Sequence, residues 1–137
     1  MTPPTPVTPM KHKTMLIVAS LLTLLLTIIH LTQDVMYQAD GTNKIPIPVV
    51  VFAVWLYGTL MLSDRIWGYI IMLFGGLIGA AMIILHSRGG IVISNTHGFF
   101  FVWTLFALST TGWFTMILSA REIWTTLRSR RSTAPAR

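Results

Sequence analysis

Four long apolar runs, none of which contains Lys, Arg, Asp or Glu, most constrain what this chain can fold into. They occupy residues 15–33, 45–63, 66–86 and 98–119. Each run is close to the ~20 residues that an α-helix needs to cross about 30 Å of hydrocarbon. A segment in lipid must satisfy its own backbone hydrogen bonds, and no run alternates polar and apolar residues as a barrel strand does. The runs therefore predict membrane-spanning helices.

The predicted fold is an all-α membrane protein whose four transmembrane helices form an antiparallel bundle, at about 14–36, 45–63, 66–86 and 97–120. Only 10% of the 137 residues are charged, whereas a soluble domain carries about a quarter. The first run is longer than the ~7–15 apolar residues of a signal peptide and lacks a small-residue cleavage site, so we expect a retained helix. The absence of cysteine excludes disulfides, thiolate metal sites and iron–sulfur clusters.

The basic residues are distributed unequally between the two sides of the predicted bundle. Lys44 and Arg88 fall on one side, and the other eight of the ten Lys and Arg residues fall on the opposite side. Cytoplasmic loops carry an excess of Lys and Arg. This bias predicts a multi-pass protein of the inner (cytoplasmic) membrane with both termini in the cytoplasm.

The two ends of the chain differ in composition from the membrane domain, which we expect to cover residues 14–127. Residues 1–13 are rich in Thr and Pro and predict a disordered cytoplasmic tail. The last helix should continue into the interface as far as residue 127, followed by a basic tail at 128–137. We expect Arg128, Arg130 and Arg131 to contact anionic lipid headgroups. Nucleic-acid binding is not expected, because the tail lacks a basic face with stacking aromatics.

Polar residues inside the apolar runs gather at one predicted depth. Along the first run, hydroxyl residues lead at intervals of three or four to His30 and then to Asp34, so they share one helical face. His86 ends the third run, and His97 directly precedes the fourth. With the predicted topology, all three histidines and Asp34 fall in one outer layer, and Asp34 can orient the His30 imidazole.

This layer is compatible with three interpretations. His30 and His86 could ligate a haem b iron axially, or one of them could ligate the magnesium of a (bacterio)chlorophyll. His30, Asp34, His86 and His97 could hold copper or zinc. Alternatively, His86 and His97 lie at the water interface, and His30 only pairs with Asp34.

A glycine-rich face runs along the third predicted helix. Gly68, Gly75 and Gly79 share it with Met72, Met82 and His86, at a spacing of four and three residues. Small residues four apart let another helix approach closely, so we expect Gly68, Gly75 and Gly79 to pack against a neighbouring helix. The alternative is that they make room for a flat cofactor.

Four segments carry a resemblance to other proteins: His-Leu-Thr-Gln-Asp at 30–34, Trp-Leu-Tyr-Gly-Thr-Leu at 55–60, Leu-His-Ser-Arg-Gly at 85–89, and the aromatic stretch 99–108. They are similar to an uncharacterised group of small bacterial four-helix membrane proteins. The resemblance covers most of the membrane part. It implies a bacterial membrane protein with this fold, and it implies no activity.

The sequence contains no phosphate-binding loop, no Gly-x-Ser-x-Gly and no His-Glu-x-x-His, so no catalytic residue is predicted. Our leading expectation is an accessory subunit of a respiratory or photosynthetic membrane complex. It would pack against other integral membrane subunits and contact lipid or pigment. The first alternative is a haem b electron-transfer module that uses His30 and His86. The second is a small copper- or zinc-handling membrane protein.

Overall fold

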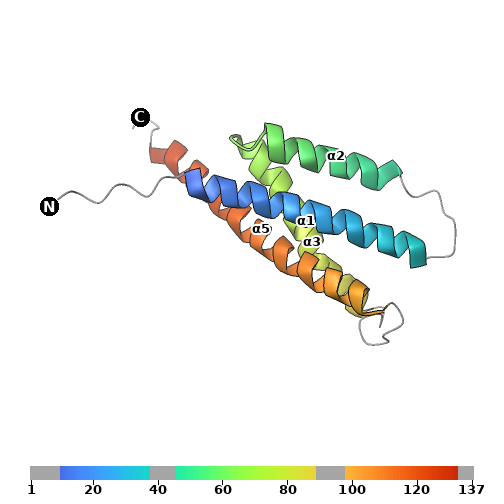
Figure 1. Cartoon of the computed structure of the whole chain (residues 1–137). Helices are drawn as coiled ribbons and strands as arrows, with labels where there is room; N and C mark the ends of the chain where they lie inside the picture. The colour runs from blue at the N-terminus through green and yellow to red at the C-terminus, as the bar shows by residue number, and fades with distance from the viewer. Residues whose placement is uncertain (1–9, 38–45, 89–97, 133–137) are drawn as a thin grey trace.

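The computed structural model describes residues 10–37, 46–88 and 98–132, and these residues form four helices (Figure 1). The helices are α1 (Met10–Tyr37), α2 (Pro46–Met61), α3 (Ile66–Arg88) and α5 (Gly98–Ser132). By length and composition, α1, α3 and α5 can each cross a membrane. The prediction of an all-helical protein with membrane-spanning helices is confirmed to this extent.

Three helix boundaries differ from those expected. Helix α1 begins at Met10, inside the segment expected to be a tail, because Pro9 is the last proline before it. Helix α5 continues to Ser132, five residues beyond the expected end of its interfacial extension at residue 127, since no Gly or Pro interrupts the sequence after Gly112 until Pro135. Helix α2 has 16 residues, about 24 Å, and is shorter than the ~30 Å hydrocarbon core. Residues 1–9 and 133–137 lie outside the described part of the chain.

The helix ends gather at two opposite ends of the molecule (Figure 1). The start of α1 lies beside the turn between α2 and α3, where Lys13 Nζ donates to Asp64 Oδ1 at 2.6 Å. We call this the Lys13 end, and α5 finishes there as well. At the other end, the Asp34 end, Thr104 Oγ1 at the start of α5 donates to Gln33 Oε1 at 2.8 Å.

Among the described helices, α3 and α5 are in the most extensive contact, and their backbones touch there. A Cβ added at Gly112 would overlap the backbone nitrogen of Ala80, and it would lie 2.8 Å from the Gly76 carbonyl oxygen. A Cβ added at Gly76 would lie 2.7 Å from the backbone nitrogen of Met116. Only glycine at these two positions allows the crossing, as in the close helix pairs common in membranes.

The three glycines expected to pack along one face of the third helix contact three different neighbours. Gly68 lies against the Leu62 carbonyl in the α2–α3 turn. Gly75 lies against the indole of Trp55 on α2, so the ring covers the position of its missing side chain. Gly79 lies against Thr23 of α1 and also against α5.

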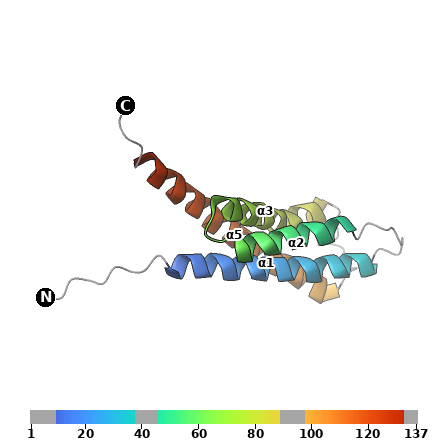
Figure 2. The same cartoon turned by 90° about the horizontal axis from the view of Figure 1, so that it is seen from above.

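Helix α1 lies alongside α2 (Figure 2). Buried polar side chains join α1 to α2 and to α5. Ser20 Oγ lies 2.8 Å from Thr59 Oγ1, and Trp55 Nε1 donates to Ser20 Oγ at 2.9 Å. Thr23 Oγ1 lies 2.9 Å from Thr115 Oγ1. Hydroxyl pairs of this kind replace the hydrogen bonds that lipid cannot supply. The polar face of α1 therefore points into the bundle.

Candidate metal centre

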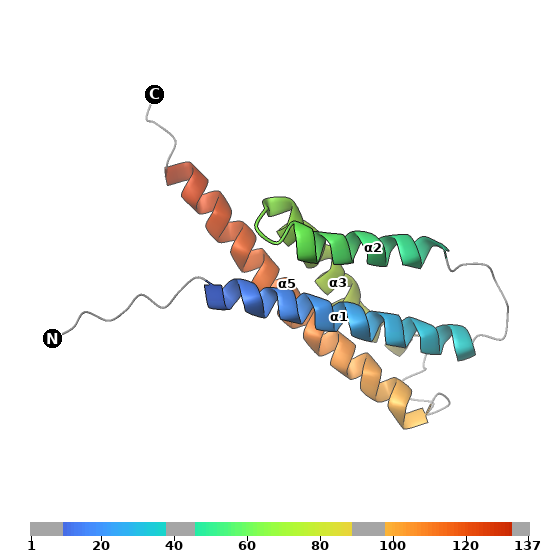
Figure 3. The same cartoon turned by 45° about the horizontal axis from the view of Figure 1, so that its top comes forward.

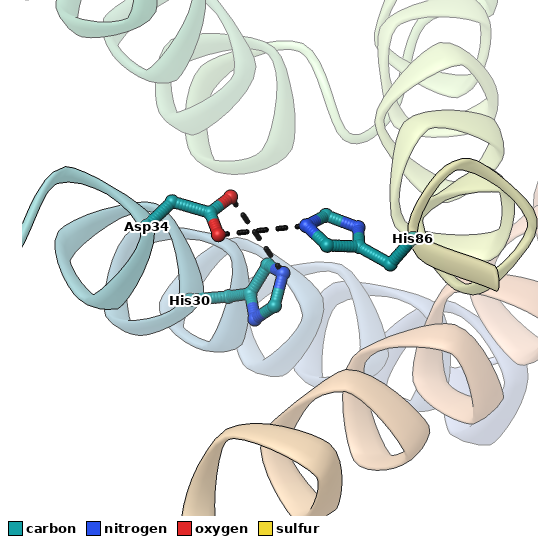
Figure 4. Close-up of side chains that lie close together, drawn as sticks. All are labelled: His30, Asp34 and His86. Atoms are coloured by element: carbon teal, nitrogen blue, oxygen red, sulfur yellow. Dashed lines mark ion pairs between the residues drawn. The ribbon is translucent and has the colours of Figure 1, made fainter. Parts of the chain in front are cut away.

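Three of the four residues of the predicted outer layer meet at the Asp34 end (Figure 4). His30 and Asp34 lie one turn apart on α1, and His86 reaches them from the last turns of α3. The distance from His86 Nε2 to Asp34 Oδ1 is 3.4 Å, and that from His30 Nε2 to Asp34 Oδ2 is 3.9 Å. The carboxylate therefore faces the Nε2 atoms of two imidazoles that come from different helices.

His30 is buried, with 1% of its surface exposed. Its ring centroid lies 4.9 Å from that of His86 and 4.7 Å from that of Phe101 on α5. Neither ring nitrogen has a hydrogen-bond partner among the residues that the structure describes. Buried polar atoms are almost always hydrogen-bonded, so a buried imidazole with no hydrogen bond at either nitrogen requires an explanation.

His86 is held in an orientation suited to ligation. Its Nδ1 lies 2.9 Å from the carbonyl oxygen of Met82, one turn earlier on α3. As the donor in this contact, Nδ1 carries the proton and leaves the lone pair on Nε2, which faces Asp34. Metal-ligating histidines are commonly fixed in this way by a backbone carbonyl.

The donor set fits a small divalent transition-metal ion. One ligand atom from each of His30, Asp34 and His86 lies within 4.8 Å of the others. In a tetrahedral zinc site with bonds of about 2.0–2.1 Å, ligand atoms lie roughly 3.3 Å apart. The contact between His86 and Asp34 already has this spacing, and His30 needs to approach by less than about 2 Å. Two imidazoles and a carboxylate suit zinc, copper and non-haem iron, and they leave a coordination position open.

A haem or a chlorin does not fit this arrangement. A macrocycle ligated by both histidines would separate their rings, but the two rings are in edge-to-face contact. Phe101 packs against both, with its centroid 5.6 Å from that of His86. Both Nε2 atoms point toward Asp34, where a macrocycle held by one histidine would have to lie (Figure 4).

The other predicted site residues lie elsewhere. His97 falls outside the described residues, directly before the first residue of α5, so its part in the site stays a prediction. His12 lies on α1 at the Lys13 end. Arg128, Arg130 and Arg131 are exposed on the last turns of α5.

Two neighbours of the site were not found by sequence reasoning. Phe101 covers both imidazoles, and the Met82 carbonyl orients His86. The position of Met82, four residues before His86, was an available signal for the backbone contact. Phe101 is one of three consecutive phenylalanines, and nothing in the sequence marks it as the one that faces inward.

We compared the chain with protein-family models, with curated proteins and with solved structures, and none of them matches. The resemblance carried by the four sequence segments therefore stays a prediction. The geometry of His30, Asp34 and His86 is the feature of this molecule that points to a function.

Proposed function

We propose that this protein is a small multi-pass membrane protein that binds zinc or copper through His30, Asp34 and His86. The observation that carries the proposal is the buried His30 imidazole, whose two ring nitrogens have no hydrogen-bond partner in the described part of the chain. A buried polar group left unsatisfied costs about 1–3 kcal/mol. A metal ion bound to Nε2 removes much of this cost, and its charge is offset by Asp34.

The open coordination position favours metal handling over a purely structural role. Structural zinc sites usually have four protein ligands, whereas sites that exchange a ligand keep three. Within its described residues the chain offers three ligands, two from α1 and one from α3. An ion held in this way can accept a fourth ligand, either from outside the protein, such as water or a metal carrier, or from the chain itself, where His97 is the predicted one. We therefore assign the protein to metal handling or metal sensing.

The metal test is a stoichiometry measurement on protein purified in mild detergent, by elemental analysis and by competition with a zinc chelator. We expect about one zinc or copper ion per chain. His30→Ala, His86→Ala and Asp34→Asn should each weaken binding by more than about 100-fold. His12→Ala is the matched control, because His12 lies on the same helix at the opposite end and should leave binding unchanged.

Two outcomes of this measurement would overturn the proposal. One is unchanged metal content in His30→Ala and His86→Ala. The other is a Soret band in the purified protein that disappears in these variants, which would restore the haem interpretation.

The membrane topology is part of the proposal. The distribution of the basic residues supports four membrane spans, antiparallel in the bundle, with both termini in the cytoplasm of a bacterium. The site would then lie at the outer surface of the inner membrane.

Because the chain has no cysteine, single Ser63→Cys and Ser87→Cys variants report directly on the two ends of α3. In intact cells, a membrane-impermeant maleimide should label position 87 and spare position 63. The reverse pattern would contradict the orientation, and equal labelling of the two positions would contradict the crossing of α3.

A second function, that of an accessory subunit in a larger membrane complex, is favoured by one face of α5. Phe99, Trp103, Phe106, Trp113 and Ile117 recur at helical spacing and are all exposed. Large aromatic side chains on one face suit contact with another membrane subunit. Native gel electrophoresis of gently solubilised membranes should then show the chain in a larger assembly that Trp103→Ala and Trp113→Ala release. Migration of the unmodified chain alone would contradict this role.

A further inference from the structure

A groove of about 810 Å³ lies between α1 and α5, on the side of the bundle away from the metal centre. The two helices cross (Figure 3), and Thr23 Oγ1 of α1 lies 2.9 Å from Thr115 Oγ1 of α5. The groove residues precede these two positions on both helices, so the groove lies on one side of this contact. Its walls are apolar, and they include Met15, Val18 and Leu22 from α1 and Phe114 from α5.

The groove follows one face of α1 from Lys11, where the candidate membrane span begins, toward the middle of the helix. Lys11, Met15, Val18 and Leu22 recur at intervals of four, three and four residues, so they share one helical face. From Lys11 to Leu22 the helix rises about 16 Å. This is close to half of the ~30 Å hydrocarbon core, which is the depth of one leaflet.

Lys11 places a positive charge at the mouth of the groove. It is exposed, and no ion-pair partner for it occurs among the described residues, whereas Lys13 is paired with Asp64 at 2.6 Å. A ligand that fits has a long apolar chain and an anionic group about one leaflet's depth from the chain's end. We propose that the groove binds one acyl chain of an anionic phospholipid, with the phosphate of the headgroup at the Lys11 ammonium.

The lining of the groove argues against a helix of a second copy as the occupant. A helix with its side chains is about 10–12 Å across. On the α5 side the groove is lined by Thr110, Thr111 and Phe114, which span about one turn, so a helix seated along α1 would have little of α5 to pack against. An extended acyl chain is thinner and can lie along the whole face between Lys11 and Leu22.

The test is native mass spectrometry of the full chain, released from nanodiscs that contain equal amounts of phosphatidylglycerol and phosphatidylcholine with identical acyl chains. We expect one retained phospholipid, predominantly phosphatidylglycerol. Lys11→Gln should reduce the preference for phosphatidylglycerol by about fivefold. Lys13→Gln is the matched control: it removes a neighbouring charge that is already paired, and the preference should remain.

A second pair of variants tests the groove itself. Val18→Trp fills the groove from an exposed position and should abolish retention of both lipids. Leu25→Trp, which is equally exposed on α1 but outside the groove, should retain them. An unchanged preference for phosphatidylglycerol in Lys11→Gln would overturn the anionic headgroup, and unchanged lipid retention in Val18→Trp would overturn the acyl-chain site. A disulfide-linked dimer of Val18→Cys in membranes would assign the groove to a second copy instead.

Discussion

Helix α5 meets α3 and α1 in two contrasting ways. Against α3 it packs backbone on backbone, with Gly76 and Gly112 at the closest approach. Against α1 it is held through side-chain polar groups, namely the hydroxyls of Thr23 and Thr115 and the contact between Gln33 and Thr104. The first interface tolerates almost no change in side-chain volume, whereas the second depends on individual hydrogen bonds.

The contrast indicates a division of roles. Helices α3 and α5 form a platform whose geometry is fixed by sterics. Helix α1 is attached to that platform by polar contacts, each of which contributes about 0.6 kcal/mol on average in membrane proteins. Two of the three candidate metal ligands, His30 and Asp34, come from α1, and the third, His86, comes from the platform. An ion bound there would clamp α1 to α3.

The largest expected effect is at the platform. Gly112→Val places a branched side chain against the backbone of Ala80, which cannot move without separating the helices. We expect the free energy of unfolding in detergent, measured by steric trapping, to fall by about 3 kcal/mol or more. Ala120→Val, exposed on the same helix, should change it by less than about 0.5 kcal/mol. Equal effects of the two substitutions would show that the crossing is not close-packed.

Binding of a metal ion at His30, Asp34 and His86 should cause the next largest change in the free energy of unfolding. At a free zinc concentration of 100 times the dissociation constant, the bound ion should raise the free energy of unfolding by about 2.7 kcal/mol. The measurement compares unfolding of purified protein with zinc and with a chelator. In His30→Ala the increase should vanish, and in His12→Ala it should persist. An increase that survives in His30→Ala would place the ion elsewhere.

Loss of a single hydroxyl pair between α1 and α5 should lower the free energy of unfolding by less than loss of the metal ion. Thr23→Val keeps the side-chain shape and removes the contact with Thr115, so we expect a loss of about 0.6 kcal/mol, and at most about 1.7 kcal/mol. Thr32→Val is the control, because Thr32 is exposed and donates to the carbonyl of Ile28 in its own helix. A loss as large as that of Gly112→Val would remove the distinction between the two interfaces.

The smallest effect is expected at the Lys13 end. The pair between Lys13 and Asp64 has a short distance, 2.6 Å, but both side chains are well exposed. Exposed ion pairs contribute between about 0 and 1 kcal/mol. Lys13→Met should therefore change the unfolding midpoint by little more than the experimental error, and the effect should shrink further at high salt. A large loss would mean that this end also anchors α1.

The positions of the helices and part of the candidate metal site could be predicted from the sequence. The spacing of His30 and Asp34 placed them on one face of one helix, and the predicted depth of His86 brought it to the same layer. The direct contact between the two imidazoles could not be predicted, because it depends on how closely α3 approaches α1 and α5. That distance is set partly by Gly76 and Gly112. Neither of them belongs to the glycine face that the four-and-three spacing predicted on the third helix. The same contact separates the metal interpretation from the haem interpretation.

The length of α5 has a practical consequence. With 35 residues it measures about 52 Å, some 20 Å more than the hydrocarbon core requires. It extends past the other helices at the Lys13 end (Figures 1 and 3). A soluble domain fused in continuous helical register after Arg131 would be carried rigidly by α5. Such a fusion would give this 137-residue protein the mass and the recognisable outline that particle alignment in electron cryo-microscopy requires.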